Sequence, residues 1–331
     1  MDDSMRETSD VVFVTGTGRS GTNILKKILS THSMVATLPF EYRFIIDPDG
    51  VVDFYNTFAA SWSPYKADHS ITRLRDFLIG LAELSDAKIE LTEKIKSKDP
   101  VGLTLTPPPY SGWELNKWIP GYQHYVEKLI ADLTAFEYSA LWPGTKSESE
   151  NNEMRFQKPL SKSELQPIIE AFLQSCFKAI CADQQKSVFL EDNTHNLLFA
   201  EELFELVPNS KMVHVYRDPR DVISSLKTQK WAPRELAQTL EWYASILDQW
   251  LDKKKSLPAD RVLEIRFEEL IAKPESTIQL IMDFTGLPIE TVTEGIDLSK
   301  SNTGRYKTEL SADELDMVES RLENIISHYN Y

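Results

Sequence analysis

Two segments, about 200 residues apart, each have the pattern of a buried strand that enters a polar, basic turn and continues as a helix. Residues 11–23 read VVFVTGTGRSGTN, and residues 211–225 read KMVHVYRDPRDVISS. A turn of this kind directs free backbone N–H groups at whatever lies above it, so each segment is suited to bind an anion. Together they predict a parallel α/β fold and a ligand that carries separate anionic groups.

Strand and helix patterns alternate along most of the chain, which is typical of a parallel sheet covered by helices. The predicted strands are 11–15, 34–38, 187–191, 211–216 and 261–266. The predicted helices are 21–32, 70–84, 121–138, 160–182, 199–207, 234–250, 274–285 and 312–328. We predict a single α/β domain over residues 1–331, with a P-loop-type parallel sheet of four to five strands flanked by helices. Residues 43–157, rich in aromatic residues and proline, are predicted to be a helical insertion.

The net charge of −15, from 36 basic and 51 acidic residues, argues against nucleic acid as a partner. An anionic ligand must therefore be held by local positive groups against the field of the whole protein. No apolar run approaches the length of a membrane span, and the polar, acidic first ten residues do not read as a signal peptide. Two cysteines, Cys176 and Cys181, are too few for a disulfide framework or a zinc site, so we predict no metal and a cytoplasmic location.

The first segment has the glycine spacing of a nucleotide phosphate loop, but Thr22 stands where that pattern has Lys. The loop is therefore predicted to cradle a phosphate without being equipped for nucleoside triphosphate hydrolysis. Arg19 can supply charge-assisted hydrogen bonds, and glycine allows close backbone approach. The predicted binding residues of this loop are Gly18, Arg19, Ser20, Gly21, Thr22 and Asn23.

The string RSGT at 19–22 resembles the 5'-phosphosulfate loop of sulfotransferases that use 3'-phosphoadenosine 5'-phosphosulfate (PAPS). It is closer to the tyrosylprotein and bacterial branch than to the cytosolic small-molecule branch, which usually has Lys at the place of Arg19. In this family an Arg just past the strand and a Ser eight positions later bind the 3'-phosphate, and Arg217 and Ser225 have that spacing. The string SNTGRYK at 301–307 resembles the family's cofactor-covering loop. Arg305 or Lys307 would close over the nucleotide, the alternative being that both are solvent-exposed charges.

The resemblance also suggests catalytic groups. In tyrosylprotein sulfotransferases and their relatives, a Glu shortly after the first helix is the general base. Glu41 occupies that place, and a surface ion pair with Arg43 is the alternative. Many members carry a Lys where this chain has Asn193, which can donate a hydrogen bond without charge. Arg19 would then provide more of the stabilisation of the transferred sulfuryl group. His195 is the second candidate for the base, since His does that work in the cytosolic branch.

The resemblance implies transfer of a sulfuryl group from PAPS to an acceptor hydroxyl, with release of adenosine 3',5'-bisphosphate (PAP). The insertion at 43–157 would form part of the acceptor pocket. Its aromatic residues suggest an acceptor with apolar or ring character: a small molecule such as a phenol, a sugar, a lipid or a peptide tyrosine. One alternative is a P-loop nucleotide kinase, which Thr22 disfavours. The other is a non-catalytic nucleotide-binding protein, which Asn193 favours.

Overall fold

The computed structural model describes residues 10–82, 113–140, 153–292, 296, 298 and 302–331. The chain divides into two compact units. The first contains residues up to Glu41, Lys186–Phe204 and the chain from Pro208 onward, and the second contains Tyr42–Gln185 and Glu205–Val207.

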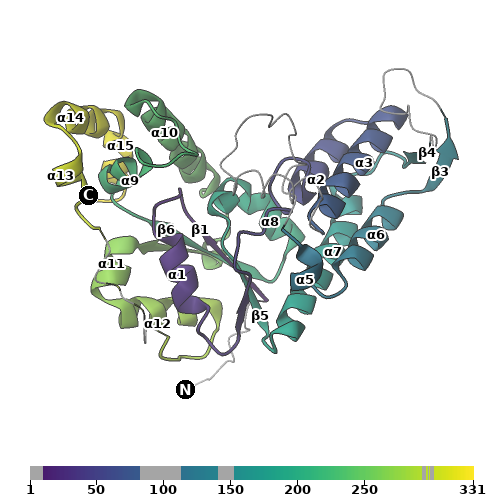
Figure 1. The fold of residues 1–331 in the computed structure, drawn as a ribbon, viewed down its shortest axis with the longest axis horizontal. Helices are drawn as coiled ribbons and strands as arrows, with labels where there is room; N and C mark the ends of the chain where they lie inside the picture. The colour runs from purple at the N-terminus through teal and green to yellow at the C-terminus, as the bar shows by residue number, and fades with distance from the viewer. Residues whose placement is uncertain (1–9, 83–112, 141–152, 293–295, 297, 299–301) are drawn as a thin grey trace, which may run out of the picture. The chain divides into compact units, whose positions relative to one another are not determined.

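A five-stranded parallel sheet organises the first unit, as predicted (Figure 1). Its strands lie in the order β2-β5-β1-β6-β7. Their bounds are β1 Val11–Thr15, β2 Val35–Thr37, β5 Val188–Glu191, β6 Ser210–Tyr216 and β7 Val262–Arg266. All residues of β1 and β5 are buried, as expected for strands that read as unbroken apolar runs.

The two strand–turn–helix segments, residues 11–23 and 211–225, lie side by side in this sheet. β1 pairs with β6 in the register Thr15↔His214, so both strands end at the same edge. The chain leaves β1 toward β2 on one side and leaves β6 toward β7 on the other. Open α/β sheets bind ligands at such a switch point, outside the carboxyl ends of the strands.

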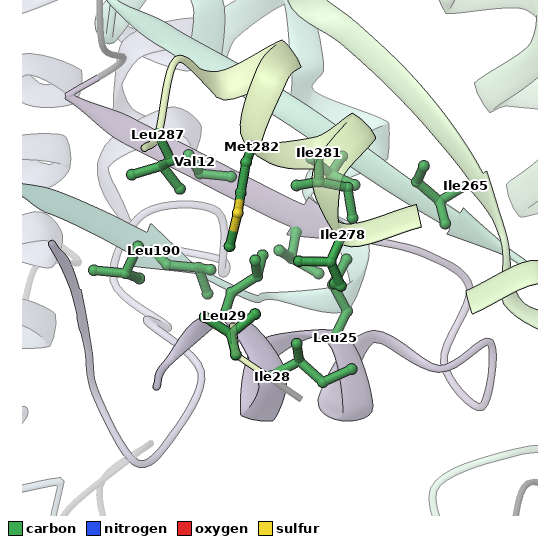
Figure 2. Packing of buried hydrophobic residues seen from close by; sticks show 14 of the residues in the cluster. Val12, Leu25, Ile28, Leu29, Leu190, Ile265, Ile278, Ile281, Met282 and Leu287 are labelled. Atoms are coloured by element: carbon green, nitrogen blue, oxygen red, sulfur yellow. The ribbon is translucent and has the colours of Figure 1, made fainter. Parts of the chain in front are cut away.

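Helices cover both faces of the sheet (Figure 1). On one face, α1 (Thr22–Leu29) and α12 (Pro274–Thr285) bury aliphatic side chains against the strands (Figure 2). On the other face, Trp250 of α10 (Leu236–Lys253) packs edge-on against His214 with ring centroids 4.9 Å apart. The remaining helices of this unit are η1 Thr194–Phe199, α8 Ala200–Leu206, α9 Pro219–Leu226, η2 Ala259–Arg261, α11 Phe267–Ala272, α13 Tyr306–Glu309, α14 Ala312–Arg321 and α15 Glu323–His328. The predicted helix 312–328 is thus two helices, because the chain leaves helical geometry at Leu322.

The second unit is mostly helical. Its elements are α2 Val51–Ala60, α3 Pro64–Gly80, α5 Leu115–Trp118, α6 Tyr122–Asp132, β3 Phe136–Ser139, β4 Glu153–Phe156 and α7 Lys162–Asp183. The predicted helix 121–138 was wrong at its end, because β3 pairs antiparallel with β4. Phe136 stacks on Phe156 across this hairpin, with ring centroids 4.7 Å apart. The sequence did not predict the hairpin or α2, and residues 83–112 and 141–152 of the predicted insertion lie outside the described residues.

Both cysteines are buried in α7, and burial raises the pKa of the Cys176 thiol. Within the described ranges, no group of three or more His, Cys, Asp or Glu side chains is arranged to hold a metal ion. None of the described helices combines the length and apolar character needed to cross a membrane.

Candidate functional site

The glycine-rich loop (Gly16–Gly21) connects β1 to α1 in an unusual backbone conformation. Gly18, Arg19 and Gly21 have φ angles of 71°, 61° and 111°, all in the left-handed region. Successive residues in such conformations turn their N–H groups toward a common point and form an anion-binding concavity. A Cβ on Gly21 would lie 2.2 Å from Cδ2 of Phe267, so only glycine fits there. Arg19 adopts the left-handed conformation although it has a side chain, so its backbone is strained.

Side chains from the second segment reach the glycine-rich loop. Arg19 Nε donates a hydrogen bond to Ser225 Oγ at 2.9 Å. Arg217 Nη1 donates to the Arg19 carbonyl oxygen at 3.3 Å. Ser225 is 1% exposed and lies in the second turn of α9, as its spacing from Arg217 predicted. The structure thus brings together the three residues to which the sequence assigned the donor phosphates.

Arg217 is buried and held from several directions. Its Nη2 donates to the Asn302 carbonyl oxygen at 2.7 Å and contacts Asp221 Oδ2 at 3.4 Å. Its guanidinium also lies over the Phe267 ring, 4.9 Å from the centroid. A guanidinium fixed in this way presents its remaining hydrogen-bonding capacity in a defined direction, which suits recognition of a phosphate.

Asp221 anchors the C-terminal loop (302–306) to the second segment. Its carboxylate accepts hydrogen bonds from the backbone N–H groups of Gly304 at 2.7 Å and Tyr306 at 3.2 Å. The side chain is fully buried. Arg220 pairs with Asp218, 2.9 Å away, and Asp218 caps the start of α9.

Three arginines converge on this part of the site. Partial burial, then the charges of Arg305 and Arg217, lower the pKa of the Arg19 guanidinium. Arg305 Nε pairs with Glu309 at 2.8 Å. Lys307 is exposed and its Nζ lies 5.8 Å from the centroid of the Tyr306 ring. Mutual repulsion of guanidinium groups in a strongly acidic protein is relieved by a bound anion.

A second edge of the loop meets the turn after β5. The Thr194 carbonyl oxygen accepts hydrogen bonds from Thr15 Oγ1 at 2.9 Å and from the Gly16 N–H at 3.3 Å. Thr194 Oγ1 lies 3.4 Å from Glu41 Oε1. The structure therefore places Glu41, half-buried, next to the turn that carries Asn193 and Thr194. Arg43 forms an ion pair with Asp47, with Nη1 3.8 Å from Oδ2.

Asn193 and His195 belong to the same turn. Asn193 Oδ1 accepts a hydrogen bond from the His195 N–H at 3.2 Å and caps η1. The Asn193 side chain is 2% exposed, and its Nδ2 has no hydrogen-bond partner within the described residues. The His195 ring packs edge-on against Trp242, with centroids 6.2 Å apart. Asn193 thus retains a donor for a ligand.

The sequence did not identify Lys26 and Asp192 as site residues. Lys26 Nζ, one turn into α1, pairs with Asp192 Oδ1 at 2.8 Å and donates to the Phe40 carbonyl oxygen at 3.4 Å. It therefore connects the residues that immediately precede Glu41 and Asn193. The only sequence signal was a Lys one helical turn after Thr22, and its partners are too distant in the chain to be inferred from spacing.

Ser20, Thr22 and Asn23 complete the predicted loop residues. Ser20 is 1% exposed, and its Oγ lacks a hydrogen-bond partner in the described part of the chain. Thr22 is buried at the start of α1, and Asn23 is exposed beside it. A buried hydroxyl at the base of an anion-binding loop is suited to contact a bound oxyanion.

A family model described as the sulfotransferase family matches residues 102–291. The chain belongs to the sulfotransferase family. The matched region contains Asn193, Arg217 and Ser225, and it begins inside the predicted insertion at 43–157. Membership confirms the prediction of a sulfotransferase and disfavours the two alternatives, a nucleotide kinase and a non-catalytic nucleotide-binding protein. It also confirms PAPS as the donor and PAP as the product.

Solved sulfotransferase structures resemble this sulfotransferase at low sequence identity. A sulfotransferase domain from the olefin synthase of Synechococcus PCC 7002 has 16% identity and a TM-score of 0.42, covering 95% of this chain and 86% of that chain. A sulfotransferase from Alicyclobacillus acidocaldarius has 15% identity and a TM-score of 0.41, covering 97% of both chains. A retinol dehydratase in complex with retinol and PAP has 13% identity and a TM-score of 0.37, covering 97% of this chain and 82% of that chain. No curated protein sequence matches this sulfotransferase significantly.

Proposed function

We propose that this sulfotransferase moves the sulfuryl group of PAPS to an acceptor hydroxyl at the edge of the sheet where β1, β5 and β6 end. The observation that carries the proposal is the cluster of Arg19, Arg217 and Arg305. Arg217 Nη1 donates to the Arg19 carbonyl oxygen at 3.3 Å, and burial, then the charges of Arg305 and Arg217, lower the pKa of the Arg19 guanidinium. Such a cluster favours a bound anion, and Asp221 and Glu309 each pair with one of its arginines. Its occurrence in a protein of net charge −15 supports a dedicated anion site.

The residues present fit a donor with two separate anionic ends. Arg217 and Ser225 would hold the 3'-phosphate, with Asn302 and Asp221 fixing the Arg217 guanidinium. The backbone N–H groups of the glycine-rich loop and the buried Ser20 hydroxyl would hold the 5'-phosphosulfate. Gly18, Gly21, Thr22 and Asn23 would shape this cradle, and Arg305 or Lys307 would cover the nucleotide.

PAPS supplies a sulfuryl group on a phosphate leaving group, so catalysis needs a base for the acceptor and positive partners for the oxygens. Glu41 would take the acceptor proton, its carboxylate oriented by Thr194 Oγ1 3.4 Å away. Arg19 and the Nδ2 of Asn193 would donate hydrogen bonds to the transferred group. His195 is the second candidate for the base, and its ring packs edge-on against Trp242.

The proposed acceptor carries a hydroxyl group, with the insertion at 43–157 contributing to its pocket. The cytoplasmic location stays a prediction from the sequence.

Calorimetric titration with PAP tests the donor site. We expect PAP to bind more tightly than ATP. The Arg217→Ala substitution should lower the affinity for PAP at least tenfold, since a charge-assisted hydrogen bond contributes about 1.5–3 kcal/mol. Arg321→Ala is the matched control, because Arg321 is an exposed arginine that pairs with Glu241 on the surface. Preference for ATP, or an Arg217→Ala variant with unchanged PAP affinity, would overturn the proposal.

A further inference from the structure

Glu268 lies beside the turn that carries Arg217, although a carboxylate is an unfavourable neighbour for a bound phosphate. The residue belongs to the first turn of α11, directly after β7. Its Oε1 accepts a hydrogen bond from the backbone N–H of Asp218 at 3.1 Å. This N–H belongs to the peptide group that joins Arg217 to Asp218, so Glu268 holds the backbone immediately after the arginine. A negative charge at this place lowers the positive potential that attracts a phosphate, and the hydrogen bond gives a reason for its presence.

Arg217 is thus held at both ends by the start of α11. Phe267, the residue before Glu268, has its ring 4.9 Å from the guanidinium carbon of Arg217. Glu268 holds the peptide group at the other end of the residue. A side chain presents its hydrogen bonds in a defined direction when neighbouring groups fix both its backbone and its rotamer. The first two residues of α11 therefore help to determine where the Arg217 guanidinium lies.

The peptide group held by Glu268 is also the entry to α9. Asp218 is the N-cap of this helix, and its Oδ1 accepts a hydrogen bond from the Arg220 N–H at 3.0 Å. Ser225 lies in the same helix. A displacement of the turn would therefore move both residues that we propose for the 3'-phosphate, Arg217 and Ser225.

Tyr331 in turn holds the Glu268 carboxylate. Its hydroxyl donates a hydrogen bond to Glu268 Oε2 at 2.5 Å, which leaves Oε1 for the backbone of the turn. The Tyr331 ring lies over the Arg266 guanidinium, 4.0 Å from the centroid, and the Tyr331 N–H donates to the Ile326 carbonyl oxygen at 3.1 Å. Burial, then the hydrogen bond to Glu268, raise the pKa of the Tyr331 hydroxyl, so it remains a donor at neutral pH.

We infer that Glu268 is a positioning residue of the proposed 3'-phosphate site and that Tyr331 holds the Glu268 carboxylate in place. This inference rests on the proposed function. Glu268 acts on the phosphate through the turn, by accepting the Asp218 N–H. Its hydrogen bond favours phosphate binding because it orders Arg217, whereas its charge disfavours phosphate binding by repulsion. Removal of the acceptor and removal of the charge alone should therefore have different effects on affinity.

Two substitutions of Glu268 separate these effects in calorimetric titrations with PAP and with adenosine 5'-monophosphate (AMP), which lacks the 3'-phosphate. For Glu268→Ala, which removes the acceptor, we expect PAP affinity to fall about tenfold and AMP affinity to change less than about twofold, the order expected for one hydrogen bond. Glu268→Gln keeps an acceptor oxygen without the charge, so its PAP affinity should equal or exceed that of the wild type. Glu269→Ala is the matched control, because Glu269 is exposed in the same turn of α11, and its PAP affinity should not fall.

Tyr331→Phe tests the second contact. It removes the hydroxyl and keeps the ring that lies over Arg266. PAP affinity should fall, by a smaller factor than in Glu268→Ala. The double variant should bind PAP as weakly as Glu268→Ala alone, because Tyr331 acts through Glu268. A double variant in which the two losses add would overturn the role of Tyr331.

The outcomes for this inference and for the proposed function are distinct. Unchanged or tighter PAP binding by Glu268→Ala would overturn the positioning role, and so would a Glu268→Gln variant as weak as Glu268→Ala. An equal loss for PAP and AMP would also overturn it, since a general loss of structure affects both nucleotides. In each of these cases a wild type that prefers PAP to AMP leaves the donor site intact. A wild type that binds the two nucleotides equally would instead contradict the proposed function.

Discussion

Arg19 and Ser225 are 206 residues apart in the chain, yet Arg19 Nε donates to Ser225 Oγ at 2.9 Å. The contact joins the two strand–turn–helix segments across the switch point of the sheet. It is possible because β1 and β6 are neighbouring parallel strands whose carboxyl ends lie at the same edge of the sheet. The residue predicted to bind the 5'-phosphosulfate and the residue predicted to bind the 3'-phosphate are therefore in direct contact.

Ser225→Ala should weaken recognition of the 3'-phosphate specifically. We expect the Kd for PAP to rise roughly 10- to 100-fold, the loss of one hydrogen bond to a charged group. Affinity for adenosine 5'-monophosphate, which lacks the 3'-phosphate, should not change. Calorimetric titration of both nucleotides measures this, and an equal loss for the two would contradict the assignment of Ser225.

Asp221→Asn should loosen both Arg217 and the C-terminal loop. The carboxylate is fully buried, pairs with Arg217 and accepts two backbone N–H groups. Removing one partner of a buried ion pair typically costs about 3 kcal/mol, so the free energy of unfolding should fall by that order. PAP affinity should fall with it. Asp248→Asn, at an exposed position of α10, is the control for urea unfolding and calorimetry. If Asp221→Asn had the same unfolding free energy and PAP affinity as Asp248→Asn, the C-terminal loop would not need Asp221 to hold its position.

Much of this arrangement could be predicted from the sequence, and the limits have a physical origin. β1 (VVFVT) is a run of mostly β-branched residues, and β6 (SKMVHVY) carries Met212, Val213 and Val215. Both end at a basic turn, so the local pattern identified both strands. The pairing of Lys26 with Asp192 and of Asp221 with the backbone of Gly304 depends on tertiary contacts that no local period encodes. The hairpin of β3 was missed for the same reason, since Phe136 gains its stabilisation from stacking on Phe156.

Gly21→Ala should damage both stability and donor binding. Gly21 has a φ of 111°, and a Cβ there would collide with the Phe267 ring, which also supports Arg217. We expect a loss of about 1–3 kcal/mol in the free energy of unfolding, together with weaker PAP binding. Gly80→Ala is the matched control, because no atom lies within 4 Å of a Cβ there and the position is helical. Equal stability of the two variants would show that the loop tolerates a side chain at position 21.

Glu264 should make the stability of the protein depend on acidic pH. Burial alone would raise the pKa of this carboxyl, but the hydrogen bond and charge of His214, then those of Lys254, outweigh burial and hold the pKa well below its usual value. The folded state therefore binds this proton less readily than the unfolded chain. The stabilisation is complete above the unfolded pKa of about 4.3 and is lost as the pH falls below it.

Urea unfolding of Glu264→Gln between pH 7 and pH 3 tests this dependence. The difference in unfolding free energy between wild type and variant should be largest at neutral pH and should shrink as the pH falls. Glu275→Gln, at an exposed position of α12, should show no such trend. A difference that stays constant with pH would contradict a depressed pKa at Glu264.

The most direct test of the account is acceptor-dependent release of PAP from PAPS by the Glu41→Gln variant, with phenols and primary alcohols offered as acceptors. Loss of a general base typically costs roughly 100- to 10,000-fold in rate. We predict a kcat reduced by that factor at unchanged PAP affinity, while the wild type and Glu275→Gln turn over at the same rate. Full activity in Glu41→Gln would contradict the account of the base and direct attention to His195→Ala. PAP binding without acceptor-dependent release in the wild type would contradict sulfuryl transfer to a hydroxyl itself.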